Sequence, residues 1–426
     1  MKKEAFVVSD LHLGAGAIEP RLEDFDQDDH LAGFVDRIAR PGVTIFINGD
    51  FLDLPQIPPY DLGPADHLLW DEASSIRKVE SAIESHCHPF DALGRFVNKG
   101  GELWLHAGNH DLDLAWPGVQ SRLRAEIGQA VKFSMTHSVY YGVHIEHGHM
   151  FTPENAPKNA ASFLHTHRFP DGTEKAYVER VWGTDFMLGF YNDLERSHPF
   201  ADNVKPILTA LYYGIKNRWV GARDILRLVL YLKRAGVPWA GVGSAVLTAP
   251  PGEDKLPKAI DDAIWQRAIG ERLAKDPKFR EELRAEIAML PQAQQALLDD
   301  GHRVQIGVGD AQTAPDGKTL GVFREERQHR AAAERLAAPG VTHVIFGHTH
   351  EEINGDMDGR LFNTGTWLPH LDFNRADVKA KIRAHGLTLD MLDDATLYDR
   401  RRMVARITPD PVGNSRVELV LADNVV

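Results

Sequence analysis

Cysteine is almost absent from this chain of 426 residues, because Cys87 is the only one. A single cysteine cannot form an intramolecular disulfide, which is typical of proteins in a reducing compartment. Long apolar runs are missing too: the least polar stretch, 235–252, is uncharged but broken by prolines and glycines. The opening "MKKEAFVVSDLHLG" has an apolar stretch too short for a secretory signal. We therefore expect a cytoplasmic protein and interpret 235–252 as a loop or short helix.

Basic residues are in the minority. The chain has 48 Lys and Arg against 61 Asp and Glu, which gives a formal net charge of -13. Proteins that bind duplex nucleic acid generally present a net basic face, so we expect no duplex nucleic acid as a partner. Apolar residues make up 43% and charged residues 26%, which is ordinary for a globular protein. The length allows two or three folded units.

The order of the predicted elements indicates an α/β protein with a helical insertion. Short apolar, β-branched runs that end in Gly, Asn, Asp or His predict strands at 5–10, 43–50, 103–111, 138–149, 342–350, 360–367, 403–408 and 416–422. Helices are predicted around 28–40, 72–98, 206–216, 222–235, 257–299 and 321–337, and strand signals are scarce in 151–340. We therefore predict one α/β domain built from 1–150 and 341–426, interrupted by a helical insertion or cap at 151–340.

Five of the predicted strand ends carry the same kinds of polar side chain. They are Asp10 and His12 in "SDLHLG", Asp50 and Asp53 in "NGDFLD", Asn109, His110 and Asp111 in "GNHD", His147 and His149 in "EHGH", and His348 and His350 in "GHTH". Loops at the carboxyl ends of strands in an α/β sheet share one crevice, so these side chains are expected to converge. Carboxylate, imidazole and amide donors suit zinc, manganese and iron, whereas structural zinc prefers thiolates.

Even seven ligands from this set, fewer than the residues named, are too many for one ion. Seven ligands suit two ions if one carboxylate bridges them. Two metal ions about 3.5–4 Å apart can bind both the attacking and the leaving oxygen of a displacement at phosphorus. Each ion also lowers the pKa of bound water, so hydroxide is available at neutral pH. We therefore expect two divalent ions, Mn²⁺ first and Fe or Zn²⁺ as alternatives, and hydrolysis of a phosphoester or pyrophosphate bond.

The ordered blocks D-x-H, G-D-x-x-D, G-N-H-[DE], H and G-H-x-H resemble the calcineurin-like metallophosphoesterase family, over about 1–150 and 340–426. The resemblance implies two packed mixed β-sheets flanked by helices, with the metals at the loop edge. It also implies which residues hold them: Asp10, His12 and His350 for one metal, Asn109, His147 and His348 for the other, and Asp50 as the bridge. His110 would protonate the leaving-group oxygen or stabilise the equatorial oxygens, and Asp53 would orient His110.

Each of these residues also has an ordinary structural interpretation. Asp10 alone could cap a helix, Asp50 could start a turn, and Asn109 could supply a left-handed turn residue; only their combination favours a site. We expect His147 rather than His149 to be the ligand, because His147 directly follows the apolar run. His86 and His88 are interpreted as surface residues and Asp111 as a structural residue. His137 and His144 are not expected to be ligands, and alternation along its strand places His144 toward water.

The insertion contains a basic amphipathic segment. Residues 216–234 read "KNRWVGARDILRLVLYLKR", with six basic residues and one acidic residue. Its apolar stripe either packs inside the insertion or, with the rest of 204–236, contacts an anionic membrane peripherally. In the second case the protein is cytoplasmic and membrane-associated, and its cap admits an acyl chain.

This cap resembles that of UDP-2,3-diacylglucosamine hydrolases, which open with a similar "SDLHLG", insert a helical cap before "GHTH" and cleave a lipid-linked pyrophosphate. The chain departs from them in having His110 where they typically carry Arg, and in its longer insertion. The expected substrate is therefore a phosphorylated small molecule, nucleotide-like or lipid-linked. Alternatives are a protein phosphatase or a nuclease of the same family, or an inactive scaffold, although the complete ligand set favours an enzyme.

Overall fold

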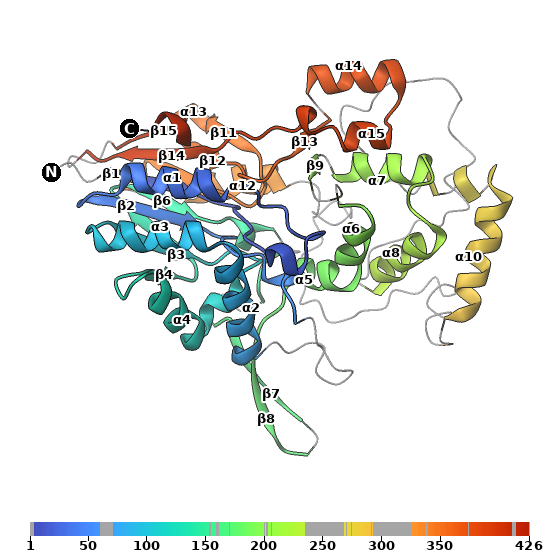
Figure 1. Ribbon diagram of the computed structural model, residues 1–426, viewed down its shortest axis with the longest axis horizontal. Helices are drawn as coiled ribbons and strands as arrows, with labels where there is room; N and C mark the ends of the chain where they lie inside the picture. Colours follow the sequence, from blue (N-terminus) through green and yellow to red (C-terminus); the bar gives the residue numbers. More distant parts are fainter. Residues whose placement is uncertain are drawn as a thin grey trace. The chain divides into compact units, whose positions relative to one another are not determined.

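The computed structural model describes residues 4–59, 71–152, 155–158, 162–169, 171–199, 201, 203–205, 207–234, 268–269, 271–273, 275–290, 292, 325–336, 340–373, 375–410 and 415–425 (Figure 1). The chain divides into two compact units. The core unit comprises Met1–Leu188, Gly321–Pro369 and Arg400–Val426, and the insertion unit comprises Gly189–Leu320 and His370–Asp399. This division differs from the boundaries expected from the sequence, because 151–188 and 321–340 belong to the core unit and 370–399 to the insertion unit.

The first sheet of the core unit has six strands in the order β15-β14-β1-β2-β3-β4. Their bounds are Glu4–Val8 for β1, Val43–Asn48 for β2, Glu102–His106 for β3, Lys132–Ser134 for β4, Met403–Thr408 for β14 and Arg416–Leu421 for β15. Strands β1 to β4 are parallel, whereas β14 and β15 are antiparallel to their neighbours. The carboxyl ends of β1, β2 and β3 therefore lie at one edge of the sheet.

The second sheet has five strands in the order β11-β12-β10-β6-β5. Their bounds are His137–Tyr140 for β5, Val143–Glu146 for β6, His343–Phe346 for β10, Glu352–Gly355 for β11 and Leu361–Thr364 for β12. The three central strands are parallel and both edge strands are antiparallel. The predicted fold class, two mixed β-sheets flanked by helices, is confirmed.

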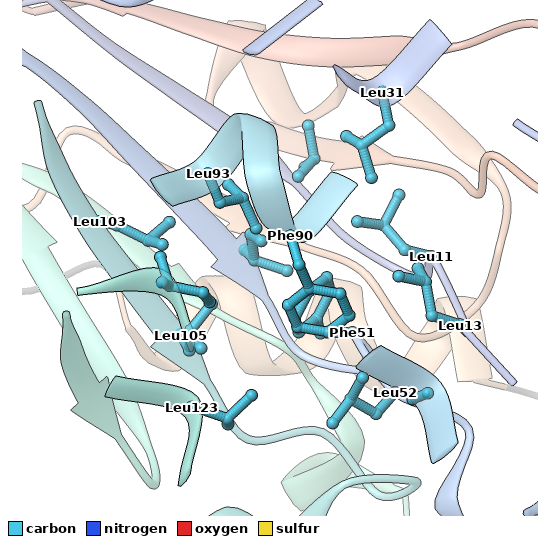
Figure 2. Packing of buried hydrophobic residues seen from close by; sticks show 14 of the residues in the cluster. Leu11, Leu13, Leu31, Phe51, Leu52, Phe90, Leu93, Leu103, Leu105 and Leu123 are labelled. Carbon is cyan, nitrogen blue, oxygen red and sulfur yellow. The ribbon is translucent and has the colours of Figure 1, made fainter. Parts of the chain in front are cut away.

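Alternate residues along the strands build two apolar layers. Ala5, Val7 and Phe46 of the first sheet form one buried cluster with Val143 and Ile145 of the second. The other face of the first sheet packs on helices α1 (Asp28–Ile38), α3 (Cys87–Asn98) and α4 (Pro117–Ile127). Figure 2 shows this packing, with Phe51 and Phe90 at the centre of a group of leucines. Strands that are covered on both faces read as continuous apolar runs, which is why they could be predicted.

Helix α12 (Glu325–Arg335) covers the outer face of the second sheet, where Ala332 and Ala333 join the cluster of Val344, Phe346 and Leu361. The core unit thus has four layers: helices α1, α3 and α4, the six-stranded sheet, the five-stranded sheet, and helix α12. In Figure 1 the strands of the two sheets come from both ends of the chain, drawn in blue to teal and in orange to red.

Two local predictions for the core unit were incomplete. The single helix expected at 72–98 is two helices, α2 (Glu72–Ser85) and α3, because the backbone leaves the helical region at His86. Pro89 is in the first turn of α3, where backbone N–H groups have no partner within the helix, so proline is tolerated there. The apolar pattern therefore continues across the break between the two helices. A hairpin of β7 (Leu164–Arg168) and β8 (Glu174–Val178), followed by α5 (Trp182–Phe186), was not predicted.

The insertion unit is mainly helical. It contains α6 (Asn192–Ser197), α7 (Ile207–Lys216), α8 (Ala222–Arg234), α10 (Pro277–Met289), α14 (Ala376–His385) and α15 (Leu389–Leu392), and β9 (Val204–Lys205) pairs with β13 (Leu371–Asp372). The apolar stripe of α8 is buried at Ile225, Leu226, Leu228 and Leu230, which favours the packing interpretation of 204–236. The predicted loop at 235–252 lies outside the described residues. The helix predicted at 321–337 corresponds to α12, and within the helix predicted at 257–299 the structure describes α10. Among the residues the structure describes, no helix has the length and apolarity needed to cross a membrane.

Candidate metal centre

The predicted ligands follow strands β1, β2, β3, β6 and β10, so the parallel topology brings them to one end of the two sheets. Their backbone is unusual. Asp10, His12, Asp50, His348 and His350 all have φ values between 49° and 70°, in the left-handed region. Residues with a Cβ seldom adopt this region, and such strain gathers at functional sites. In each case the chain turns sharply directly after a strand and directs a polar side chain to the sheet edge.

Two glycines allow these loops to approach one another. A Cβ on Gly49 would collide with the imidazole ring of His147, and a Cβ on Gly108 would collide with the carboxylate of Asp50. Gly49 also has a φ of +86°, which glycine adopts without strain. The "GD" and "GN" pairs in the sequence therefore combine a ligand with the small residue that makes room for a second ligand.

Asp10, His12 and His350 form the first group. The Nε2 atom of His350 lies 3.3 Å from Asp10 Oδ1 and 3.1 Å from Nε2 of His12. One ligand atom from each of the three residues lies within 4.8 Å of the others. The backbone N–H of His348 donates to both oxygens of Asp10 at 3.0 Å, which fixes the carboxylate between the first and last blocks of the chain.

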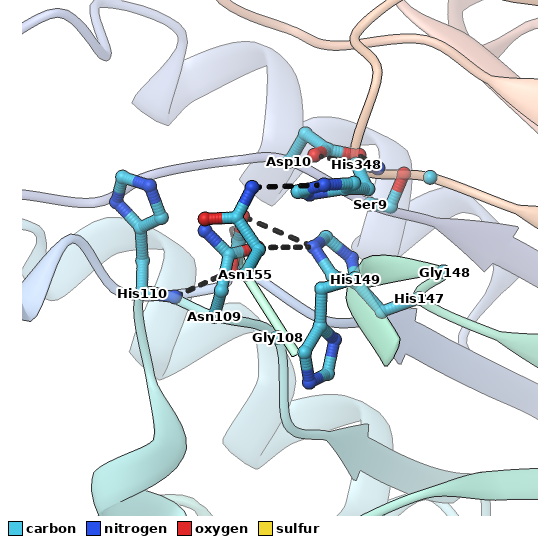
Figure 3. A network of polar contacts seen from close by, with 12 residues as sticks. Ser9, Asp10, Gly108, Asn109, His110, His147, Gly148, His149, Asn155 and His348 are labelled. Atoms are coloured by element: carbon cyan, nitrogen blue, oxygen red, sulfur yellow. Dashed lines mark hydrogen bonds and ion pairs between the residues drawn. The ribbon is translucent and has the colours of Figure 1, made fainter. Parts of the chain in front are cut away.

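Asp50, Asn109, His147 and His348 form the second group. The Nε2 atom of His147 lies 3.1 Å from Asp50 Oδ2 and 3.3 Å from Asn109 Oδ1. Ligand atoms of Asp50, His147 and His348 also lie within 4.8 Å of one another. Asp50 Oδ2 is 3.7 Å from Nε2 of His12, so Asp50 lies between the two groups. Figure 3 shows Asp10, Asn109, His147 and His348 converging from separate strands.

Asp53 contacts two histidines at once. Its Oδ1 is 3.0 Å from Nδ1 of His110, and its Oδ2 is 3.0 Å from Nδ1 of His12. The predicted pair of Asp53 and His110 is therefore in contact, and Asp53 also orients His12 of the first group. The side chain of His110 is 15% exposed, and its backbone N–H donates to Asp50 Oδ1 at 2.9 Å.

The electrostatics of the site favour ionised carboxylates. Burial alone would raise the pKa of Asp50, but the neighbouring His147 and His110 outweigh it and hold this pKa well below its usual range. Burial likewise opposes protonation of His147, but the Asp50 carboxylate raises the pKa of His147 to about 9. A buried cluster that favours anionic carboxylates and gathers positive charge beside them is an environment suited to cations.

The donor set consists of side chains that could hold metal ions. Two buried carboxylates, four imidazoles and one amide oxygen meet at this edge, and they belong to Asp10, Asp50, His12, His147, His348, His350 and Asn109. These oxygen and nitrogen donors suit divalent transition ions. Asp50 lies where a bridging carboxylate is needed. The structure thus places all seven predicted ligands together, and these residues fit two divalent cations.

Of the two histidines in "EHGH", His147 contacts Asp50, as the sequence order suggested, whereas the ring of His149 lies next to that of His147. The His149 ring is buried, its centroid lies 5.4 Å from that of His147, and neither ring nitrogen has a hydrogen-bond partner in the described part of the chain. Burial is the main reason why the pKa of His149 is lowered to about 3. His149 is therefore held as a neutral side chain.

Two polar residues beside His348 were missed by the sequence reasoning. Thr152 Oγ1 lies 3.1 Å and Asn155 Nδ2 3.3 Å from His348 Nε2. Both occur in "TPEN", which follows "EHGHMF" directly. Their position after a predicted strand end, three to eight residues from His147 and His149, was the signal that could have identified them.

Asp111 joins two of the loops. Its buried carboxylate accepts hydrogen bonds from the backbone N–H groups of Gly108 at 2.6 Å and Phe51 at 2.8 Å. Leu52 donates a longer one at 3.4 Å. The loop that holds Asn109 is thus fixed to the loop that holds Asp50, in line with the structural interpretation of Asp111.

The predictions for two other histidines were wrong. His86, expected at the surface, is buried, and its Nδ1 and Nε2 lie 2.8 Å from Asp28 Oδ1 and 3.3 Å from Glu23 Oε2. His144 is buried as well, on the outer face of the second sheet, with Nε2 2.8 Å from Glu146 Oε2. Alternation along a strand predicted the correct face for His144, but the side chain is buried there against Glu146 and the ring of His137. His88 is exposed, as predicted.

A cleft opens beside His110. It is lined by Asn109, His110, Leu112, Asp113, Val178, Glu179, Arg180 and Thr184. Arg180 pairs with Asp185 at 2.7 Å, and Thr184 Oγ1 donates to the backbone carbonyl of Asn109 at 3.4 Å. The unpredicted β8 strand and α5 therefore supply one wall of the cleft, and Asn109 and His110 supply the other.

The fold and the site together define an α/β sandwich with a candidate metal centre at one sheet edge. No protein-family model matches this chain, and no curated protein matches it either.

Proposed function

We propose that the chain is a metal-dependent hydrolase of phosphoester or pyrophosphate bonds that belongs with the calcineurin-like metallophosphoesterases. One observation carries the proposal: the seven ligands expected from five separate sequence blocks lie at one sheet edge, with Asp50 between the two groups. The alternative in which each residue has its own structural role does not account for this convergence. A cytoplasmic location and a phosphorylated small-molecule substrate, nucleotide-like or lipid-linked, belong to the same proposal.

Asp10, His12 and His350 would hold one divalent ion, Asn109, His147 and His348 the other, and Asp50 both. When bound, such ions neutralise phosphate oxygens and lower the pKa of water, so that hydroxide is available to attack phosphorus at neutral pH. Mn²⁺ is the first choice, with Fe or Zn²⁺ as alternatives.

His110 would transfer the proton to the leaving group. Its Nδ1 lies 3.0 Å from Asp53, which fixes the orientation of the ring and stabilises its protonated form. With Nδ1 engaged, Nε2 is the atom that gives a proton to the leaving oxygen. His110 also lines the cleft, so a substrate in the cleft would be next to its proton donor.

Arg180 is the basic residue among those that line the cleft, beside the acidic Asp113 and Glu179. Arg is the side chain best suited to phosphate oxygens, so Arg180 would contact the phosphoryl group. Asp185 compensates its charge at 2.7 Å, so the arginine is held in place before substrate binds.

The test is a substrate panel with several metal ions: p-nitrophenyl phosphate, bis-p-nitrophenyl phosphate, a nucleoside-diphosphate lipid, a phosphopeptide and single-stranded DNA. Asp50→Asn and His110→Ala should abolish turnover and leave the circular dichroism spectrum unchanged. His167→Ala, on the exposed part of β7, is the matched control. Turnover of only the peptide or only the DNA identifies the protein phosphatase or the nuclease. Metal binding without turnover of any substrate identifies an inactive scaffold and refutes the proposal.

A further inference from the structure

A second group of metal-ligating side chains lies on the outer face of the five-stranded sheet. It consists of His137 on β5 and of His144 and Glu146 on β6. One ligand atom from each of the three residues lies within 4.8 Å of the others. None of these residues contributes a ligand to the candidate metal centre.

The strand register explains why the three side chains meet. His137 is directly opposite Glu146 in the antiparallel pair, and His144 precedes Glu146 by two residues. All three therefore point to the same face. That face is the outer one, because Val143 and Ile145 point into the cluster between the sheets and Ser138 contacts His106 of the first sheet at 2.9 Å.

The contacts within the group go beyond an ordinary ion pair. Glu146 and His144 are both buried, at 6% and 5% exposure, and their Oε2 and Nε2 atoms are 2.8 Å apart. The ring of the exposed His137 does not extend into water but stacks on His144, with 4.7 Å between centroids and 19° between planes. His137 thus places a third donor beside His144 and Glu146, although the hydrogen bond between these two residues does not need it.

We propose that His137, His144 and Glu146 bind a single Zn²⁺ ion at a site separate from the candidate metal centre. Two imidazoles and one carboxylate are a ligand set that binds zinc tetrahedrally and leaves one position for water. The ion would link the edge strand β5 to β6, and it would stabilise the folded state because it binds that state only.

The test compares zinc binding by the full chain and by His137→Ala. His137 is exposed, so its removal should leave the fold intact. The chelator-treated proteins are titrated with Zn²⁺ in competition with a chromophoric chelator. His137→Ala should bind one equivalent fewer than wild type, or bind it at least about tenfold more weakly, since even the loss of a ligand's hydrogen-bond partner costs 10–100-fold in affinity. His167→Ala should bind as wild type does.

An Asp50→Asn background separates this site from the candidate metal centre. In that background Zn²⁺ should still bind at the sheet site, and adding His137→Ala should remove it. The single variant His137→Ala should keep the turnover of wild type, whatever the substrate. Equal stoichiometry and affinity in wild type and His137→Ala, with unchanged melting temperatures in saturating Zn²⁺, would overturn the inference.

Discussion

The most informative single substitution is Asp53→Asn, because it changes one oxygen to an amide and keeps the shape of the side chain. Asp53 now accepts from Nδ1 of His12 and from Nδ1 of His110, each at 3.0 Å. Asparagine has one carbonyl oxygen, so it can accept from only one of them and presents an N–H₂ group to the other. That histidine must then change tautomer or turn its ring.

The magnitude follows from the contact that is lost. A hydrogen bond to a charged group contributes about 1.5–3 kcal/mol, which corresponds to roughly 10–150-fold. If the amide faces His110, the loss falls on kcat, and the comparable Asp→Asn change in a Ser-His-Asp triad lowers kcat about 10⁴-fold. If it faces His12, the loss falls on metal affinity, by about 10–100-fold. We therefore expect kcat/KM to fall by at least about tenfold.

The assay measures kcat and KM at increasing Mn²⁺, together with bound metal. Recovery at high Mn²⁺ assigns the defect to His12, whereas a low kcat at full occupancy assigns it to His110. Asp36→Asn is the matched control, because Asp36 is partly exposed and pairs with Arg95 on the surface at 2.7 Å. If Asp53→Asn kept both the kcat and the metal affinity of wild type, the role assigned to Asp53 would be wrong.

Three further predictions concern metal, loop and pH. Exhaustive chelation should abolish hydrolysis and Mn²⁺ should restore it; activity in the metal-free protein would contradict the mechanism. Asp111→Ala should lower the free energy of unfolding by about 2–4 kcal/mol in urea titrations, because it leaves the buried N–H groups of Gly108 and Phe51 unpaired. Burial would lower the pKa of His86, but Asp28 and Glu23 raise it to about 9. Its stabilisation is thus complete below pH about 6.5 and lost as the pH rises through 9, by at most about 3 kcal/mol, and His86→Gln should flatten the melting temperature over that range.

The strands and the metal-ligand blocks could be predicted from the sequence because their signals are local. β2 is buried along its whole length, so "VTIFIN" reads as a continuous apolar run, and Gly49 and Asp50 end it. Each block occurs at the carboxyl end of such a run. Parallel topology then brings the ends together, and no knowledge of loop conformation is needed.

The residues that were missed or misplaced depend on contacts distant in sequence. His86 is buried because Glu23 and Asp28, about 60 residues earlier, pair with it. The hairpin β7–β8 did have a local signal, the Asp171-Gly172 turn with φ +87° at the glycine, but its strands lack apolar alternation because half of their side chains are exposed and only Val178 is fully buried.

The left-handed backbone at the ligands connects the stability of the core with the site. Five ligand residues adopt it, at about 1–3 kcal/mol each, so the loops retain this conformation only because other contacts fix it. These contacts join distant blocks: Thr366 Oγ1 donates to the carbonyl of Asp10 at 2.8 Å, and the backbone N–H groups of Leu11 and His12 donate to the carbonyl of Asp50 at 3.0 Å and 2.9 Å. The donors are therefore arranged by the protein itself. The proposed metal centre requires such an arrangement before any ion binds, which is why the convergence of the side chains can carry the functional proposal.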